Sequence, residues 1–142
     1  MKPITICVAA VVAVAAGWGC GQSDEDQVRQ TLQRFGQAVA AKDAERLCRD
    51  LLAKELLNRL AQAGVPCDVA LSRGLAGASQ PTLRVLKVDV RSDRLAYAVV
   101  RTDAANQQPS TDTFRVVKER GRWRVGSLTG SEPNAPAAPG GP

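Results

Sequence analysis

The spacing of the apolar residues changes from a helical period to a strand period near Thr82. Before Thr82 they recur every three or four positions, as on one face of an α-helix. After it, short segments rich in Val, Leu, Thr and aromatic residues alternate with turn-forming residues, a pattern typical of antiparallel strands. Because the helices precede the strands and do not alternate with them, the sequence predicts an α+β fold, with N-terminal helices packed on a four-stranded antiparallel sheet.

Three helices are predicted in the first part of this domain. A capping box in its acidic form begins at Ser23, so the first helix is expected over Asp24–Ala41. Asp43 is a good N-cap for the second helix, whose apolar stripe rotates along its length. That rotation predicts a break or kink near Ala53–Lys54. A short third helix is expected over Asp68–Leu75.

Four strands are predicted in the second part, over Thr82–Val90, Arg94–Thr102, Ser110–Lys118 and Arg122–Leu128. Tight turns are expected at 91–93 and 119–121, and a longer polar loop at 103–109. In the first strand the apolar positions change face between Val85 and Leu86, which predicts a β-bulge or burial on both faces.

The first twenty residues have the layout of a bacterial export signal. Lys2 precedes an apolar run from Ile4 to Ala16, which is shorter than the roughly 20 residues needed to span a bilayer. The tetrapeptide Gly17–Cys20 then resembles the lipobox of bacterial lipoproteins, in which the cysteine thiol receives a diacylglyceryl group. The sequence therefore predicts a signal peptide over 1–19 and a lipid anchor at Cys20, with residues 20–23 as the tether.

This interpretation places the protein on the extracytoplasmic side of the cell membrane, and two alternatives remain open. Ala13-Val14-Ala15 fits the rule for ordinary signal-peptide cleavage, which would give a secreted protein. Gly17 and Trp18 differ from the residues usual in a lipobox, which weakens the match, but the lipid anchor remains the first choice. The other alternative is an uncleaved membrane helix.

The four cysteines are expected to have separate fates. Cys7 would leave with the signal peptide, and Cys20 would carry the lipid. Cys48 and Cys67 then remain as a pair in an exported domain, which favours a disulfide between them. The alternative is a metal site or a nucleophilic cysteine, but the chain has no His and no Cys-x-x-Cys pair. No metal or cofactor is therefore predicted.

Three segments carry a resemblance to a known family: Val28-x₃-Leu32-x₂-Phe35 with the Ala-rich helix and Lys42-Asp43 after it, Cys48–Leu52, and Glu119–Val125. On these segments the chain resembles the nuclear transport factor 2-like superfamily, in its SnoaL-like and exported bacterial branches. The resemblance covers nearly the whole predicted domain, 24–129. It implies a curved antiparallel sheet wrapped over helices, a cystatin-like cone with a pocket at its mouth. Residues 130–142 are rich in Pro, Ala and Gly and are predicted to be a disordered tail.

The resemblance also suggests where a site would lie. Tyr97, Phe114 and Trp123 are candidates to line the pocket. Enzymes of this superfamily generally use an Asp or His partnered by Tyr, and this chain has no His and a single Tyr. Asp89 and Asp112 are then the candidate general bases, although carboxylates on strands are more often solvated. No catalytic residue is assigned, and a non-catalytic protein is favoured over an enzyme.

Basic residues exceed acidic ones, 19 to 14, and the excess gathers around the last predicted hairpin, at Arg115, Lys118, Arg120, Arg122 and Arg124. Such a face could meet anionic lipid headgroups, an acidic partner or only solvent, and nucleic acid is not expected outside the cell. The predicted function is a non-catalytic, membrane-anchored domain that binds a small apolar ligand or a protein partner. The alternatives are a homodimerisation or assembly module, and a small isomerase- or dehydratase-like enzyme.

Radiolabelled palmitate is expected to enter this protein in a bacterial host, because acyl chains on Cys20 would hold it stably on the membrane. A Cys20→Ser variant should lose the label and leave the membrane fraction. Label that enters both proteins equally, or neither of them, would count against the lipid anchor.

Overall fold

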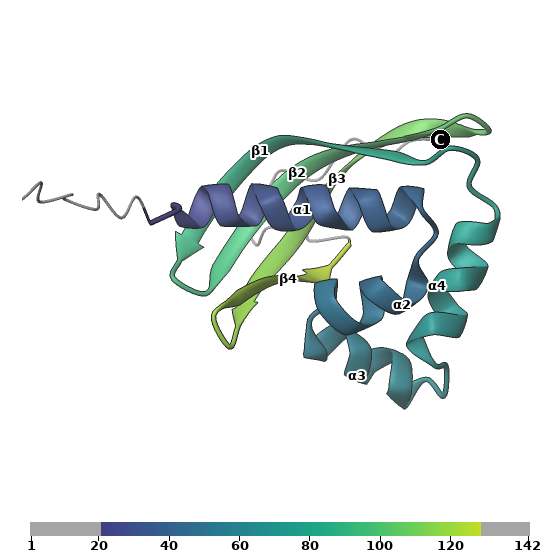
Figure 1. Cartoon of the computed structure of the whole chain (residues 1–142), viewed down its shortest axis with the longest axis horizontal. Coiled ribbons are helices and arrows are strands. Elements are labelled where there is room, and N and C mark those ends of the chain that lie inside the picture. The colour runs from purple at the N-terminus through teal and green to yellow at the C-terminus, as the bar shows by residue number, and fades with distance from the viewer. Residues whose placement is uncertain (1–20, 129–142) are drawn as a thin grey trace, which may run out of the picture.

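Helices cover one face of a single curved sheet in the computed structural model, which describes residues 21–128 (Figure 1). The strands pair antiparallel in the order β1-β2-β3-β4, which confirms the predicted α+β fold. The predicted signal peptide over 1–19, the lipid anchor at Cys20 and the tail over 130–142 lie outside the described residues. None of the helices described here is long and apolar enough to cross a bilayer.

The helical part consists of α1 (Asp24–Ala40), α2 (Ala44–Arg46), the π-helical turn η1 (Leu47–Leu51), α3 (Lys54–Gln62) and α4 (Cys67–Ala76). The predicted caps are present. The Ser23 hydroxyl accepts a hydrogen bond from the Asp26 N–H at 3.1 Å, and the Asp43 carboxylate accepts one from the Arg46 N–H at 2.9 Å. Each cap satisfies a backbone donor that the first helical turn leaves without a partner.

The predicted break in the second helix has a tertiary cause. After η1 the backbone becomes extended at Leu52, which forms a parallel bridge with Val125 of β4. The N–H of Ala53 donates to the carbonyl of Val125 at 2.9 Å. The chain therefore leaves its helix to pair with the edge of the sheet, and α3 starts directly afterwards.

The strands are β1 (Thr82–Ser92), β2 (Leu95–Ala104), β3 (Gln107–Glu119) and β4 (Arg122–Ser127). The predicted β-bulge is confirmed, because the pairing of β1 with β2 shifts between Val85 and Lys87. The last hairpin turns at Arg120 and Gly121, whose φ angles are both positive, 49° and 76°. Two positive φ angles characterise the tight turn that matches the strand twist, and glycine adopts this conformation without strain.

The prediction of a long polar loop over 103–109 is wrong. Both strands continue through this segment, and only Ala105 and Asn106 form the turn. The Asn106 side chain donates to the carbonyl of Gly77 at 2.8 Å and accepts from the N–H of Ser79 at 2.9 Å. These contacts bind the β2–β3 turn to the chain after α4. The turn is thereby held in place, and the polar residues on either side of it remain in β2 and β3.

Helix α1 packs across the inner face of the sheet, the face on which Ala96, Ala98 and Val100 are fully buried (Figure 1). Its apolar stripe is buried against this face at Val28, Leu32, Phe35 and Ala38. The rings of Phe35 and Phe114 meet edge to face with their centroids 5.8 Å apart. A pair of this kind adds about 0.5–1.5 kcal/mol to the effect of burial alone.

Gly36 marks a close approach between α1 and β1. A Cβ atom at this position would lie 3.2 Å from the Cβ of Leu83, closer than side chains normally pack. Glycine inside a helix costs up to about 1 kcal/mol relative to alanine. The contact with Leu83 explains why the helix carries glycine here.

The start of α1 is bound to the end of the sheet through Asp24. Its Oδ1 accepts a hydrogen bond from Lys118 Nζ at 2.8 Å and one from Trp123 Nε1 at 3.3 Å. Lys118 also lies over the Trp123 ring, 5.4 Å from its centroid. The hydrogen bond from Lys118, helped by the one from Trp123, holds the pKa of Asp24 below its ordinary value against the opposing effect of desolvation.

An Asp24→Asn variant should be less stable than the wild type at pH 7. Because the folded-state pKa of Asp24 lies below its unfolded-state value, its stabilisation is complete above about pH 4 and is lost as the pH falls through the folded-state pKa. Urea unfolding free energies of the two proteins should therefore differ at pH 7 and converge on acidification.

The matched control is Asp68→Asn, since Asp68 also lies in the first turn of a helix. Among the described residues no hydrogen bond or ion pair involves its side chain. Equal losses for both variants would mean that the helix dipole, and not the contact with Lys118 and Trp123, accounts for the effect.

Candidate functional site

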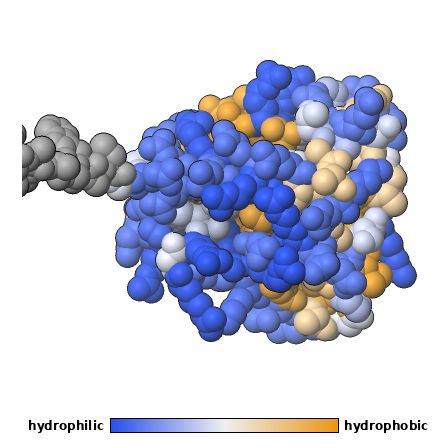
Figure 2. All heavy atoms as spheres, viewed as in Figure 1, coloured by the Kyte–Doolittle hydropathy of each residue, from blue (hydrophilic) through white to orange (hydrophobic). Residues whose placement is uncertain are grey.

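An apolar pocket of about 270 Å³ lies where the second half of α1, helix α4 and the inner face of β1–β3 meet. Its apolar walls include Phe35, Val39, Leu71, Leu75, Leu83 and Phe114. In Figure 2 the end of the molecule beside the start of α1 is mostly hydrophilic. Hydrophobic residues gather toward α3 and α4, and a further group lies at the top of the view, over the sheet.

Polar groups lie at the sheet side of this pocket. The hydroxyl groups of Thr102 and Ser110 both line it and are 2.8 Å apart. Ser110 also donates to Asp112 Oδ2 at 2.6 Å. Asp103 is the only carboxylate among the described residues that line the pocket, and Arg101 Nε lies 3.3 Å from it. An apolar wall with a few hydroxyl groups at its rim is typical of a small-molecule binding site.

The three predicted pocket residues do not come together. Phe114 lines the pocket. Trp123 is buried, but it packs at the other end of α1 beside Asp24. Tyr97 alternates with the fully buried Ala96 and Ala98, so it lies on the outer face of the sheet. Side chains on a strand alternate between the two faces, and the buried face of β2 is the one that carries the alanines.

The two candidate general bases lie outside the pocket. Asp89 is on the outer face, opposite Tyr97 in the strand register, and its carboxylate lies 3.1 Å from the guanidinium of Arg91. Asp112 is hydrogen-bonded to Ser110 at the edge of the sheet and does not line the pocket. Within 21–128, no group of three or more His, Cys, Asp or Glu side chains has the arrangement of a metal site.

Several pocket residues were not predicted from the sequence. Four of them come from α4 and the residues just after it: Leu71, Gly74 and Leu75 lie on the helix, and Ala78 follows its end. The spacing of the three on the helix places them on one face of it, and this spacing is the signal that could have identified them. Leu128, 39% exposed, adds apolar surface just after β4.

The basic residues around the last hairpin are largely paired. Arg115 Nη1 lies 2.8 Å from Glu55, and this hydrogen bond is the main reason that the pKa of Glu55 is lowered. Lys118 is bound to Asp24, and Arg124 is 3.9 Å from Glu119. The structure therefore brings α1 and α3 carboxylates onto a hairpin that is strongly basic in sequence.

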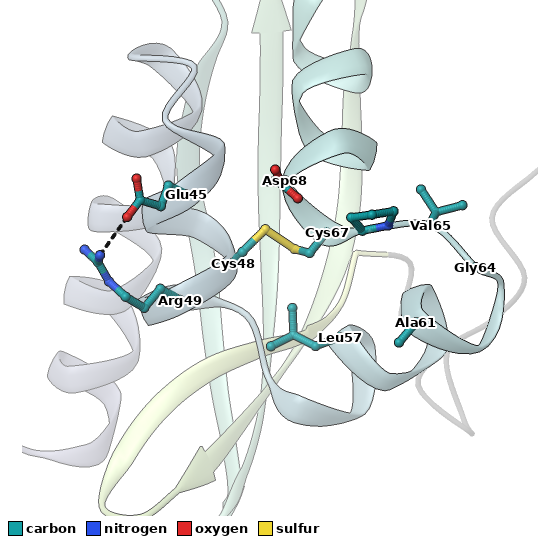
Figure 3. A pocket seen from close by; sticks show the side chains of 10 residues that line it. Glu45, Cys48, Arg49, Leu57, Ala61, Gly64, Val65, Cys67 and Asp68 are labelled. Atoms are coloured by element: carbon teal, nitrogen blue, oxygen red, sulfur yellow. Dashed lines mark hydrogen bonds and ion pairs between the residues drawn. A yellow bond between two sulfur atoms is a disulfide. The ribbon is translucent and has the colours of Figure 1, made fainter.

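The predicted disulfide is confirmed: Cys48 of η1 is bonded to Cys67, the first residue of α4, with their Cα atoms 6.0 Å apart. Figure 3 shows the bond in an open groove of about 900 Å³ between these two elements and α3. The ion pair of Glu45 with Arg49, 2.9 Å long, borders the groove. The disulfide attaches the first residue of α4 to η1. Helix α4 is one wall of the apolar pocket, so the bond helps to hold that wall in place.

No protein-family model matches the chain, and no curated protein is significantly similar to it. The resemblance to the nuclear transport factor 2-like superfamily therefore stays a prediction.

Removing the disulfide with a Cys48→Ser, Cys67→Ser double variant should lower the free energy of unfolding by about 3 kcal/mol. The bond closes a loop between residues 19 positions apart, and its loss restores that loop's conformational entropy to the unfolded chain. Urea denaturation of the variant and of the wild type, each with and without reductant, checks this value. A wild type as stable reduced as oxidised would contradict it.

Proposed function

We propose that this domain binds a small apolar molecule in the pocket between α4 and the inner face of the sheet, without catalysing a reaction on it. The observation that carries the proposal is the pocket itself, with apolar walls from α1, α4 and three strands. Neither Asp89 nor Asp112 lines it, and Asp103, the lining carboxylate among the described residues, is paired with Arg101, so the chemistry of the pocket favours binding over proton transfer.

The size of the pocket limits the ligand. An engineered cavity of about 150 Å³ with apolar walls is known to hold benzene. On that scale, a pocket of about 270 Å³ suits a molecule of roughly ten non-hydrogen atoms. Because Ser110 donates to Asp112, Thr102 donates to Ser110. Both hydroxyl oxygens keep lone pairs, which offer an acceptor to one donor group of the ligand.

The cellular setting that we propose follows from the export signal and the lipobox. A lipid on Cys20 would hold the domain at the extracytoplasmic face of the membrane, with only residues 21–23 between the anchor and α1. Secretion after cleavage at Ala15 is the alternative. The ligand would in either case be met outside the cytoplasm.

A second candidate function is homodimerisation through the outer face of the sheet. Leu95, Tyr97, Val99 and Val117 share this face and are only half-buried, and Leu86, at the bulge, is 50% exposed. A row of apolar side chains on one face of a sheet suits the interface of a symmetric dimer.

Filling the pocket provides the test. Gly74 lines it from α4, and a Cβ atom at this position would meet nothing within 4 Å. Gly74→Leu should therefore occupy the pocket without a clash and strengthen the helix by about 0.5–1 kcal/mol. With naphthalene as the probe, saturable binding to the wild type should weaken at least tenfold in this variant.

Gly77→Leu is the matched control, because Gly77 also has open space around it but does not line the pocket. It should bind the probe as the wild type does. Equal binding by the Gly74→Leu protein would overturn the assignment of the pocket. Native mass spectra of the same proteins report any co-purified apolar molecule, and they also report whether the chain forms dimers.

A further inference from the structure

A third cavity, of about 650 Å³, lies between the first half of α1, the α2–η1 segment and the start of β4. It shares no residue with the apolar pocket. Its walls are polar and mainly come from Gln27, Gln30, Arg34, Arg46, Asp50 and Arg122. We infer that this cavity is a binding site for a phosphate group.

The charge of the cavity supports an anion. Three guanidinium groups, those of Arg34, Arg46 and Arg122, line it, and Asp50 is the only carboxylate among the described lining residues. Asp50 Oδ2 lies 3.4 Å from the guanidinium of Arg49, which is not part of the cavity wall. The cavity therefore has a clear excess of positive charge.

The three arginines lack carboxylate partners. Arg34 donates only to the neutral side chain of Gln30, at 3.0 Å. Among residues 21–128, neither Arg46 nor Arg122 has a side-chain hydrogen bond or ion pair, and Arg46 is half-buried. Arg34 and Arg122 are exposed, but like charges that line one cavity still repel one another, and a bound anion would remove that repulsion.

Three other arginines of the helical part each pair with a carboxylate one helical turn away. Arg29, Arg49 and Arg59 each lie within 4 Å of a Glu four residues before them. Arg34 and Arg46 have no Glu or Asp at that position. Arg73 of α4 also lacks one, but only Arg34 and Arg46 of these three line the cavity.

Phosphate fits these groups for reasons of geometry. The guanidinium group is planar and presents parallel N–H donors, which match two oxygens of a phosphate. The side-chain amides of Gln27 and Gln30 add neutral donors and acceptors at the rim. A phosphate could therefore accept hydrogen bonds from α1, α2 and β4 together.

The cavity lies beside the start of the described chain. Gln22 lines it, and the carbonyl of Gln22 accepts a hydrogen bond from Gln27 Nε2 at 2.9 Å. If Cys20 carries a lipid, the phosphate of a lipid headgroup lies within reach of this cavity. The other source is a soluble phosphate or phosphate ester, and the two sources share the same recognition chemistry.

The test uses the full chain in detergent and inorganic phosphate as the probe, titrated by calorimetry at constant ionic strength. Wild type should bind phosphate saturably, and Arg46→Gln and Arg122→Gln should each weaken binding at least fivefold. Arg84→Gln is the matched control, because Arg84 is exposed on β1 away from the cavity and has no ion pair among the described residues. It should bind phosphate as the wild type does.

Competition then identifies the source. Glycerol phosphate that displaces the probe, where phosphatidylglycerol in mixed detergent micelles does not, indicates a soluble ligand, and the reverse indicates a lipid headgroup. Displacement by neither makes inorganic phosphate the ligand. Binding that never saturates, or that Arg84→Gln weakens as much as Arg46→Gln in proteins with unchanged circular dichroism, would overturn the site.

Discussion

The packing of α1 on the inner face of the sheet is the contact on which the rest of the structure depends. Ala96 and Ala98 leave room for the helix over β2, and Gly36 allows its close approach to β1. Both candidate sites take a wall from this helix. Phe35 and Val39 face the apolar pocket, whereas Gln27, Gln30 and Arg34 face the polar cavity. A helix held less closely would leave both sites without a fixed shape.

The position of α4 is determined by two further links. Leu52 pairs with Val125 at the sheet edge, which ends η1 and sets where α3 begins. The disulfide from Cys48 then attaches the start of α4 to η1, and Asn106 attaches the chain after α4 to the β2–β3 turn. Both ends of α4 are thus fixed, although the helix itself has no fully buried residue. Its half-buried leucines are available to the pocket for this reason.

Where unpaired positive charge lies in this protein depends on tertiary pairing more than on composition. The last hairpin is basic in sequence, but Asp24 and Glu55, from other elements, pair with two of its cations. The arginines around the polar cavity come from three separate elements, and only Arg122 among them belongs to that basic hairpin. Net charge alone therefore pointed to the hairpin, whereas the structure brings Arg122 of that hairpin together with Arg34 and Arg46 of the helices.

The sequence by itself determined the order and type of the elements, the caps at Ser23 and Asp43, the bulge near Leu86 and the pairing of Cys48 with Cys67. These features depend on local periodicity, on single side-chain hydrogen bonds, or on there being only two cysteines left to pair. The structure alone decided that Tyr97 faces outward, that residues 103–109 remain in strands, and which residues line each site. Those outcomes follow from contacts between distant segments: the alanine face of β2 meets α1, and Asn106 binds the chain after α4. No local pattern contains such contacts, because each depends on where another element lies.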